Sequence, residues 1–121
     1  MRPVVVVGPC AAGKTTLVGG LRALGVEARA VAQEHSAVSR LYRQHARDGT
    51  VFVYLTADYR VLRARRPLSG GRPQYQAEWE RLSDARAAAH LLVHTDGVPI
   101  ATVRDRVYAF LASLEDCRSD H

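Results

Sequence analysis

The chain has 121 residues, short enough for a single domain and long enough to bury a hydrophobic core without disulfide or metal staples. Hydrophobic residues make up 47% of it and charged residues 24%, as in an ordinary globular protein, and no internal repeat is visible, which excludes low-complexity and repeat proteins. The net charge of +5 suits an anionic ligand such as a nucleotide, a phosphate ester or nucleic acid.

The first half of the chain alternates between strand and helix signals. Residues 4–7 are four consecutive valines, which predict a strand buried on both faces. After a glycine-bearing loop, leucines at helical spacing predict a helix over residues 14–24. Residues 26–33 form a second candidate strand, and a helix over residues 36–47 is expected to begin at a Ser36 cap.

The same alternation continues to the end. We predict a strand at residues 51–55, a helix over 59–66 capped by Asp58, and a loop at 67–75. A helix over 76–90 follows, with Trp79 in the core. The chain then continues with a strand at 91–95 and an amphipathic terminal helix from Val103 to Leu114. Alternating elements of this kind build a mostly parallel sheet covered by helices on both faces. We therefore expect one α/β domain over residues 1–121 with about four strands.

The stretch "GPCAAGKT" carries the clearest chemical signal. Gly8, Gly13, Lys14 and Thr15 match the P-loop pattern G-x-x-x-x-G-K-[ST]. Glycines allow backbone conformations that turn amide groups toward an anion, and the following helix adds its positive end. Lys14 can reach the β- and γ-phosphates of a nucleotide, and the Thr15 hydroxyl can bind Mg²⁺.

The loop contributes further residues to the predicted nucleotide site, and its lysine stands out. Lys14 is the one lysine beside sixteen arginines, as expected where a ring of amides admits a compact ammonium and not a guanidinium. Thr16 would lie next to the α-phosphate. The positions between the glycines vary in such motifs, so Cys10 is either a neutral spacer or a thiol near a helix N-terminus. The predicted nucleotide-binding residues of the loop are Gly8, Cys10, Ala11, Ala12, Gly13, Lys14, Thr15 and Thr16.

Three segments resemble the P-loop kinases of the nucleoside-monophosphate-kinase type, the group that contains adenylate, shikimate and gluconate kinases. They are "GPCAAGKTTL", "VFVYLTADYRVLRARRP" and "AAAHLLVHTDG". The resemblance implies the three-layer fold of P-loop NTPases, binding of ATP with Mg²⁺, and transfer of the γ-phosphate to a small-molecule acceptor. It also implies that Lys14 and an arginine of the second segment stabilise the transferred group, with Arg65 and Arg66 first and Arg72 on the following loop next. The alternative for each arginine is a solvated helix end.

The chain departs from these kinases in two respects. In these kinases an acidic residue at the end of a strand beside the P-loop strand helps to hold the hydrated Mg²⁺ ion. Glu34 is the best substitute in this chain. The alternative role of Glu34 is that of an acid at a helix N-terminus, completing the cap near Ser36. The kinases are also longer, with five parallel strands. An acceptor would lie between residues 34–50 and the 67–76 loop, with candidate groups at Arg40, Tyr42, Arg43 and His45.

Other functions remain open from the sequence alone. The main alternative is a nucleotide-binding module that has lost its acceptor site. Nucleic-acid binding ranks low because the arginines are scattered. Two cysteines at opposite ends form neither a metal motif nor a disulfide framework, and four valines are too few for a signal-peptide core, so we expect a cytoplasmic protein with no membrane partner.

Overall fold

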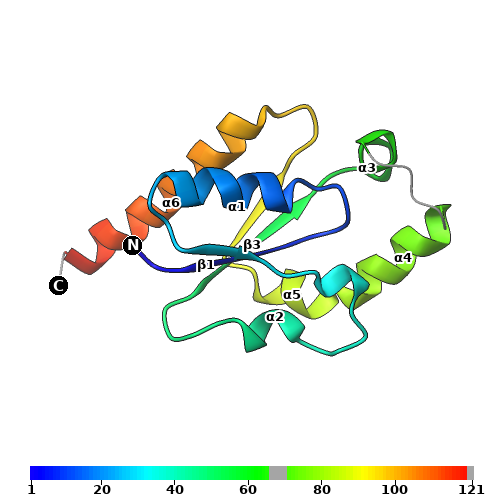
Figure 1. Cartoon of the computed structure of the whole chain (residues 1–121), viewed down its shortest axis with the longest axis horizontal. Coiled ribbons are helices and arrows are strands. Elements are labelled where there is room, and N and C mark those ends of the chain that lie inside the picture. Colours follow the sequence, from blue (N-terminus) through cyan, green and yellow to red (C-terminus); the bar gives the residue numbers. More distant parts are fainter. Residues whose placement is uncertain (66–70, 120–121) are drawn as a thin grey trace.

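The computed structural model describes residues 1–65 and 71–119, and it alternates strands with helices along the chain (Figure 1). The elements are β1 (Val4–Val7), α1 (Lys14–Ala23), β2 (Ala28–Ala30), the 3₁₀ helix η1 (Gln33–His35), α2 (Leu41–Gln44), β3 (Val51–Thr56), α3 (Tyr59–Arg65), α4 (Gly71–Arg81), α5 (Ser83–Ala88), β4 (Leu91–His94) and α6 (Ile100–Ser119). No helix of the described part combines the length and apolar character that crossing a bilayer requires.

The four strands form one parallel sheet in the order β2-β1-β3-β4. β1 lies inside the sheet, and its Val6 is in register with Ala30 of β2 and Val53 of β3. Because all four strands are parallel, their carboxyl ends lie along the same side of the sheet, and the loops that follow the strands leave from there. Ligands of open α/β folds bind at these carboxyl ends. The predicted parallel α/β sheet of about four strands is confirmed.

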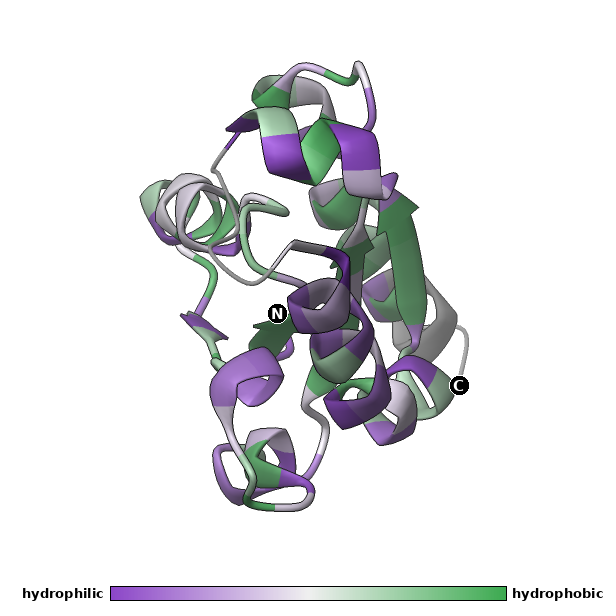
Figure 2. Cartoon of the chain, turned by 90° about the vertical axis from the view of Figure 1, so that its right-hand side faces the viewer, coloured by the Kyte–Doolittle hydropathy of each residue, from purple (hydrophilic) through white to green (hydrophobic). Residues whose placement is uncertain are grey.

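Helices cover both faces of the sheet, as predicted. On one face, α1 and α6 pack over β1 and β3 through a core that includes Leu17, Leu21, Val103 and Val107. On the other, α2 and α5 pack through a second core that includes Tyr42, one of the largest fully buried side chains. The two inner strands, β1 and β3, are mostly hydrophobic, whereas the helices mix hydrophobic and hydrophilic residues (Figure 2). This pattern is typical of a sheet buried between two layers.

The helix predicted over residues 36–47 is wrong, because α2 spans only Leu41–Gln44. The buried side chain of Gln33 donates to the carbonyl oxygen of Val38 at 2.9 Å and accepts from the backbone N–H of Tyr42 at 3.0 Å. These bonds hold the segment between them in a turn. Ser36 is extended, and its hydroxyl accepts from the backbone N–H of Val38 at 3.0 Å instead of capping the expected helix.

Other boundaries also differ from the predictions. The strand expected over residues 26–33 covers only Ala28–Ala30, because the η1 turn begins soon afterwards. The helix expected over 76–90 is two helices, α4 and α5. Residues 71–75 of the predicted loop belong to α4, where Pro73 is tolerated in the first turn because no hydrogen bond is lost there; the other residues of that loop lie outside the described ones.

Trp79 was expected in the core, and this prediction is wrong. Its side chain is 39% exposed, and the guanidinium carbon of Arg86 lies 3.6 Å from its ring centroid. Leu82 and Ala85 occupy the buried side instead. The expected Asp58 cap is present, because its carboxylate accepts from the backbone N–H of Arg60 at 2.9 Å.

Candidate functional site

The loop between β1 and α1 has the backbone conformations that its glycines were predicted to supply. Gly8 has a φ of +154° and lies against β3, and Gly13 has a φ of +98° immediately before the helix. Ala11 also lies in the left-handed region, with a φ of +70°. A turn is closed by the backbone N–H of Ala12, which donates to the carbonyl oxygen of Pro9 at 3.2 Å. The loop therefore bends sharply at the edge of the sheet before α1 begins.

At the N-terminus of α1, several backbone N–H groups have no acceptor within the described part of the chain. No side chain caps this helix, and its first turn carries no acidic residue. Among the described residues, nothing accepts a hydrogen bond from the backbone amides of Gly13, Lys14, Thr15 and Thr16. Unpaired amides together with the positive end of a helix dipole attract an anion. The electrostatics of this corner therefore favour a negatively charged ligand.

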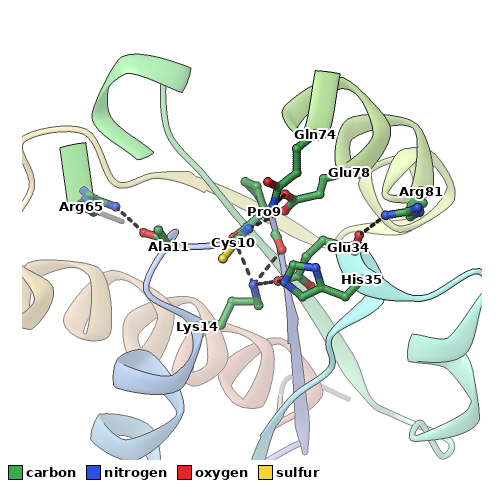
Figure 3. Close-up of polar contacts among 11 residues, drawn as sticks. Pro9, Cys10, Ala11, Lys14, Glu34, His35, Arg65, Gln74, Glu78 and Arg81 are labelled. Carbon is green, nitrogen blue, oxygen red and sulfur yellow. Dashed lines mark hydrogen bonds and ion pairs between the residues drawn. The ribbon is translucent and has the colours of Figure 1, made fainter. Parts of the chain in front are cut away.

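Lys14 folds back into the loop (Figure 3). Its ammonium group donates to the carbonyl oxygens of Gly8 and Pro9, at 2.8 and 3.1 Å, and forms an ion pair with Glu34. The lysine side chain is only 11% exposed. All three ammonium protons therefore have acceptors within the protein.

Glu34 reaches the loop from η1, which spans Gln33–His35 and is separated from the end of β2 by two residues. It is 2% exposed, and its Oε2 atom pairs with Lys14. Among the described residues, its buried Oε1 atom has no hydrogen-bond partner. Arg81 donates to its backbone carbonyl at 3.2 Å. Glu34 therefore faces the loop and does not complete the cap of a helix starting near Ser36, which was the alternative interpretation.

Glu78 is a further residue of the loop corner that the sequence reasoning missed. It projects from α4, is 1% exposed, and its Oε1 atom accepts from the backbone N–H of Cys10 at 2.9 Å. Gln74 donates to its other oxygen at 3.2 Å. A signal was present, because Glu78 lies one helical turn before Leu82, on the side of the helix that is buried.

The arginines that were predicted to bind phosphate do not all lie beside the loop. Arg65 lies beside the loop, where it donates to the carbonyl oxygen of Ala11 at 3.2 Å and to the hydroxyl and carbonyl oxygens of Thr95 at 3.0 and 2.7 Å. Arg72 instead lies over the Tyr59 ring, 4.7 Å from its centroid, and lines a cavity apart from the loop. Arg66 lies outside the described residues.

Two cavities flank the loop and share three of its residues. One has a volume of about 460 Å³ and the other about 360 Å³. The shared residues are Ala11, Gly13 and Thr16. The larger cavity is lined in addition by Cys10, Lys14, Thr15, Ala30, Ala32, Glu34 and His35. The smaller is lined in addition by Ala12, Arg65, Thr95, Val98, Ile100 and Val103.

The candidate acceptor groups of the sequence prediction line neither of these cavities. Tyr42 is fully buried, and its hydroxyl donates to the carboxylate of Asp84; burial and this bond raise the pKa of the phenol. Arg40 and Arg43 also pair with Asp84, both at 3.4 Å. His45 contacts Arg29 near the opposite end of the strands. These groups stabilise the packing of α2 against α5 and the edge of β2.

No protein-family model matches this chain, and no curated protein matches it either.

Proposed function

We propose that the loop at residues 8–16 binds the phosphates of ATP together with Mg²⁺, and that the chain transfers the γ-phosphate to a small molecule. The observation that carries the proposal is the set of four backbone amides at the start of α1 that have no acceptor among residues 1–65 and 71–119, with the ammonium group of Lys14 enclosed by the same loop. An anion with several oxygens is the ligand that such a group of donors recognises.

The cavities on either side of the loop support a nucleotide as that anion. The smaller cavity combines apolar side chains, Val98 and Ile100, with the cationic group of Arg65. A base and ribose there would leave the phosphates over Gly13 and Thr16, which line both cavities. Cavities of this size and mixed lining are typical of small-molecule sites.

The larger cavity supplies the groups that phosphoryl transfer needs. The exposed Thr15 offers a hydroxyl oxygen, the hard donor that Mg²⁺ prefers, beside Lys14. Mg²⁺ bound with the nucleotide would neutralise charge on the phosphates. Lys14 would exchange the carbonyl oxygens of Gly8 and Pro9 for phosphate oxygens and hold charge that develops on the transferred group.

A second function is a nucleotide-binding module without transfer. It is favoured by one observation, which is that Tyr42, Arg40 and Arg43 are engaged with Asp84 and line neither loop cavity. In this case the same phosphate site would bind ATP but present it to no acceptor.

Thermal-shift measurements test the binding step. ATP·Mg²⁺ or GTP·Mg²⁺ at millimolar concentration is expected to raise the melting temperature of the wild-type chain, since a ligand that binds only the folded state stabilises it. Lys14→Ala should lose this shift, while exposed Arg63→Ala should keep it. No shift with either nucleotide would overturn both functions. Transfer of labelled phosphate from ATP to nucleosides, sugars or small acids would then separate the kinase from the binding module.

A further inference from the structure

Three potential metal ligands converge behind the loop. Glu34 and His35 come from η1 and Glu78 comes from α4, forty-odd residues later in the chain. One ligand atom of each lies within 4.8 Å of the others. Figure 3 shows the three side chains around the start of the loop. We propose that Glu34, His35 and Glu78 form a binding site for a divalent transition-metal ion such as Mn²⁺.

Charge and burial give the first argument for this site. Glu34 and Glu78 are 2% and 1% exposed, so two carboxylates are buried close together. Lys14 pairs with only one oxygen of Glu34, and the other is buried with no partner among the described residues. A buried, unpaired carboxylate oxygen is costly. A cation bound between the carboxylates would satisfy this oxygen.

The geometry permits such an ion. Ligands that lie about 2.1 Å from an ion in tetrahedral geometry are roughly 3.4 Å from one another, and the three atoms here lie within 4.8 Å of one another. Binding an ion therefore requires each of the three ligand atoms to move by up to about 1 Å. His35 can make such a shift because its side chain is 50% exposed at the wall of the larger cavity. The cavity also gives the ion a path from solvent.

Glu78 can bind an ion without releasing the loop. Its Oε1 atom accepts one hydrogen bond from the Cys10 amide and its Oε2 atom one from Gln74. Each carboxylate oxygen has a second lone pair that can face a cation. The same carboxylate can therefore support the loop and ligate the metal.

The donor set points to a transition metal and not to Mg²⁺. One imidazole nitrogen with two carboxylates suits Mn²⁺, Fe²⁺, Co²⁺ or Zn²⁺, whereas Mg²⁺ prefers oxygen donors alone. The site differs in its ligands from the Thr15 position proposed for nucleotide-bound Mg²⁺. It needs no nucleotide, so it stands independently of the proposed function.

Lys14 is the competing cation at this site. Its ammonium group occupies Oε2 of Glu34 in the nucleotide-free chain, so it repels an ion that approaches the same carboxylate. Removing it with Lys14→Ala should leave the affinity for the metal equal or higher. The same substitution should abolish nucleotide binding, which separates the two proposals.

The test is titration of the untagged, metal-stripped and nucleotide-free chain with Mn²⁺, following free Mn²⁺ by electron paramagnetic resonance. We expect one ion per chain and no displacement by a hundredfold excess of Mg²⁺. Glu78→Gln keeps an acceptor for the Cys10 amide but removes the charge, and it should weaken binding more than about tenfold. His35→Ala should do the same, and because His35 is exposed, this variant keeps the assay valid even if Glu78→Gln fails to fold.

Two control variants change residues of the same types that lie outside the proposed metal site. Glu80→Gln lies on the exposed side of the same helix, and His94→Ala removes another exposed histidine. Both should bind Mn²⁺ as the wild type does. The proposal would be overturned by absence of saturable 1:1 binding, by wild-type affinity in His35→Ala, by displacement with a hundredfold excess of Mg²⁺, or by loss of binding in a folded Lys14→Ala variant.

Discussion

Gly8 makes the closest backbone approach of the loop, and replacing it tests how the loop leaves the sheet. A Cβ atom at this position would lie 2.2 Å from the carbonyl oxygen of Leu55, which is 0.8 Å closer than the 3.0 Å below which real Cβ contacts are essentially never found. The obstacle is the backbone of β3, which is paired with β1 and cannot rotate away. The φ of +154° is a second cost, because side chains rarely adopt it.

The expected loss of stability in Gly8→Ala is the sum of these two costs. Overpacking of a close-packed region costs about 1–3 kcal/mol, and a strained backbone conformation costs about 1–3 kcal/mol. Gly8→Ala should therefore lower the free energy of unfolding by about 2–6 kcal/mol, a large share of the ~5–15 kcal/mol of a typical domain.

Urea unfolding monitored by circular dichroism measures this loss, with Gly19→Ala as the matched control. A Cβ at Gly19 meets nothing within 4 Å inside α1, so this substitution should stabilise the chain by about 0.5–1 kcal/mol. If Gly8→Ala unfolded within 1 kcal/mol of the wild type, about the spread of ordinary substitutions, the described contact between the loop and β3 would be wrong.

Three further predictions concern Arg65, Asp84 and Gln33. Arg65→Ala should weaken ATP·Mg²⁺ binding roughly tenfold in calorimetry, which corresponds to about 1.4 kcal/mol, because the substitution removes a cation beside the loop. Equal weakening in Arg63→Ala would refute a specific role of Arg65. The hydrogen bond from Tyr42, reinforced by the charges of Arg43 and Arg40, lowers the pKa of Asp84 below its usual value of 3.8. The ionised Asp84 therefore stabilises the folded chain above pH 3.8, and this stabilisation is lost as the pH falls through the lower pKa of the folded state. Asp84→Asn should therefore reduce the free energy of unfolding at pH 7 by no more than about 1 kcal/mol, since the side chain is partly exposed, and the difference should shrink in acid; a loss independent of pH would contradict this. Gln33→Ala should cost about 2–3 kcal/mol in urea unfolding, because it leaves the buried amide of Tyr42 without its acceptor, and a cost below 0.5 kcal/mol, the level of a surface substitution, would show that Gln33 does not hold the turn.

Local signals made much of the fold predictable. The four valines of β1 and the leucine spacing of α1 specify buried elements by themselves, and the glycines between them fit the conformations of the loop. The parallel sheet followed from the alternation of strands and helices. These features depend on residues close together in the sequence.

Predictions failed where individual side-chain contacts, which hydrophobic periodicity does not encode, decide the structure. The turn after η1 replaces a helix because a buried glutamine binds two backbone groups, and Trp79 lies outward because Arg86 stacks on it. Glu78 meets the Cys10 amide across 68 residues, which no local pattern could reveal. Glu34 was expected at the end of its strand, but it lies in η1, past the end of β2, and its pairing with Lys14 emerged only from the structure.

The most direct test of the central claim is calorimetric titration of ATP·Mg²⁺ into the wild-type chain and into Lys14→Arg. The ammonium group of Lys14 lies between the carbonyl oxygens of Gly8 and Pro9 and is nearly buried, and the broader guanidinium of arginine does not fit this space. We predict one bound nucleotide per wild-type chain and no measurable binding to a folded Lys14→Arg variant. Wild-type affinity in Lys14→Arg, or no binding to the wild type, would contradict the assignment of this loop to nucleotide phosphates.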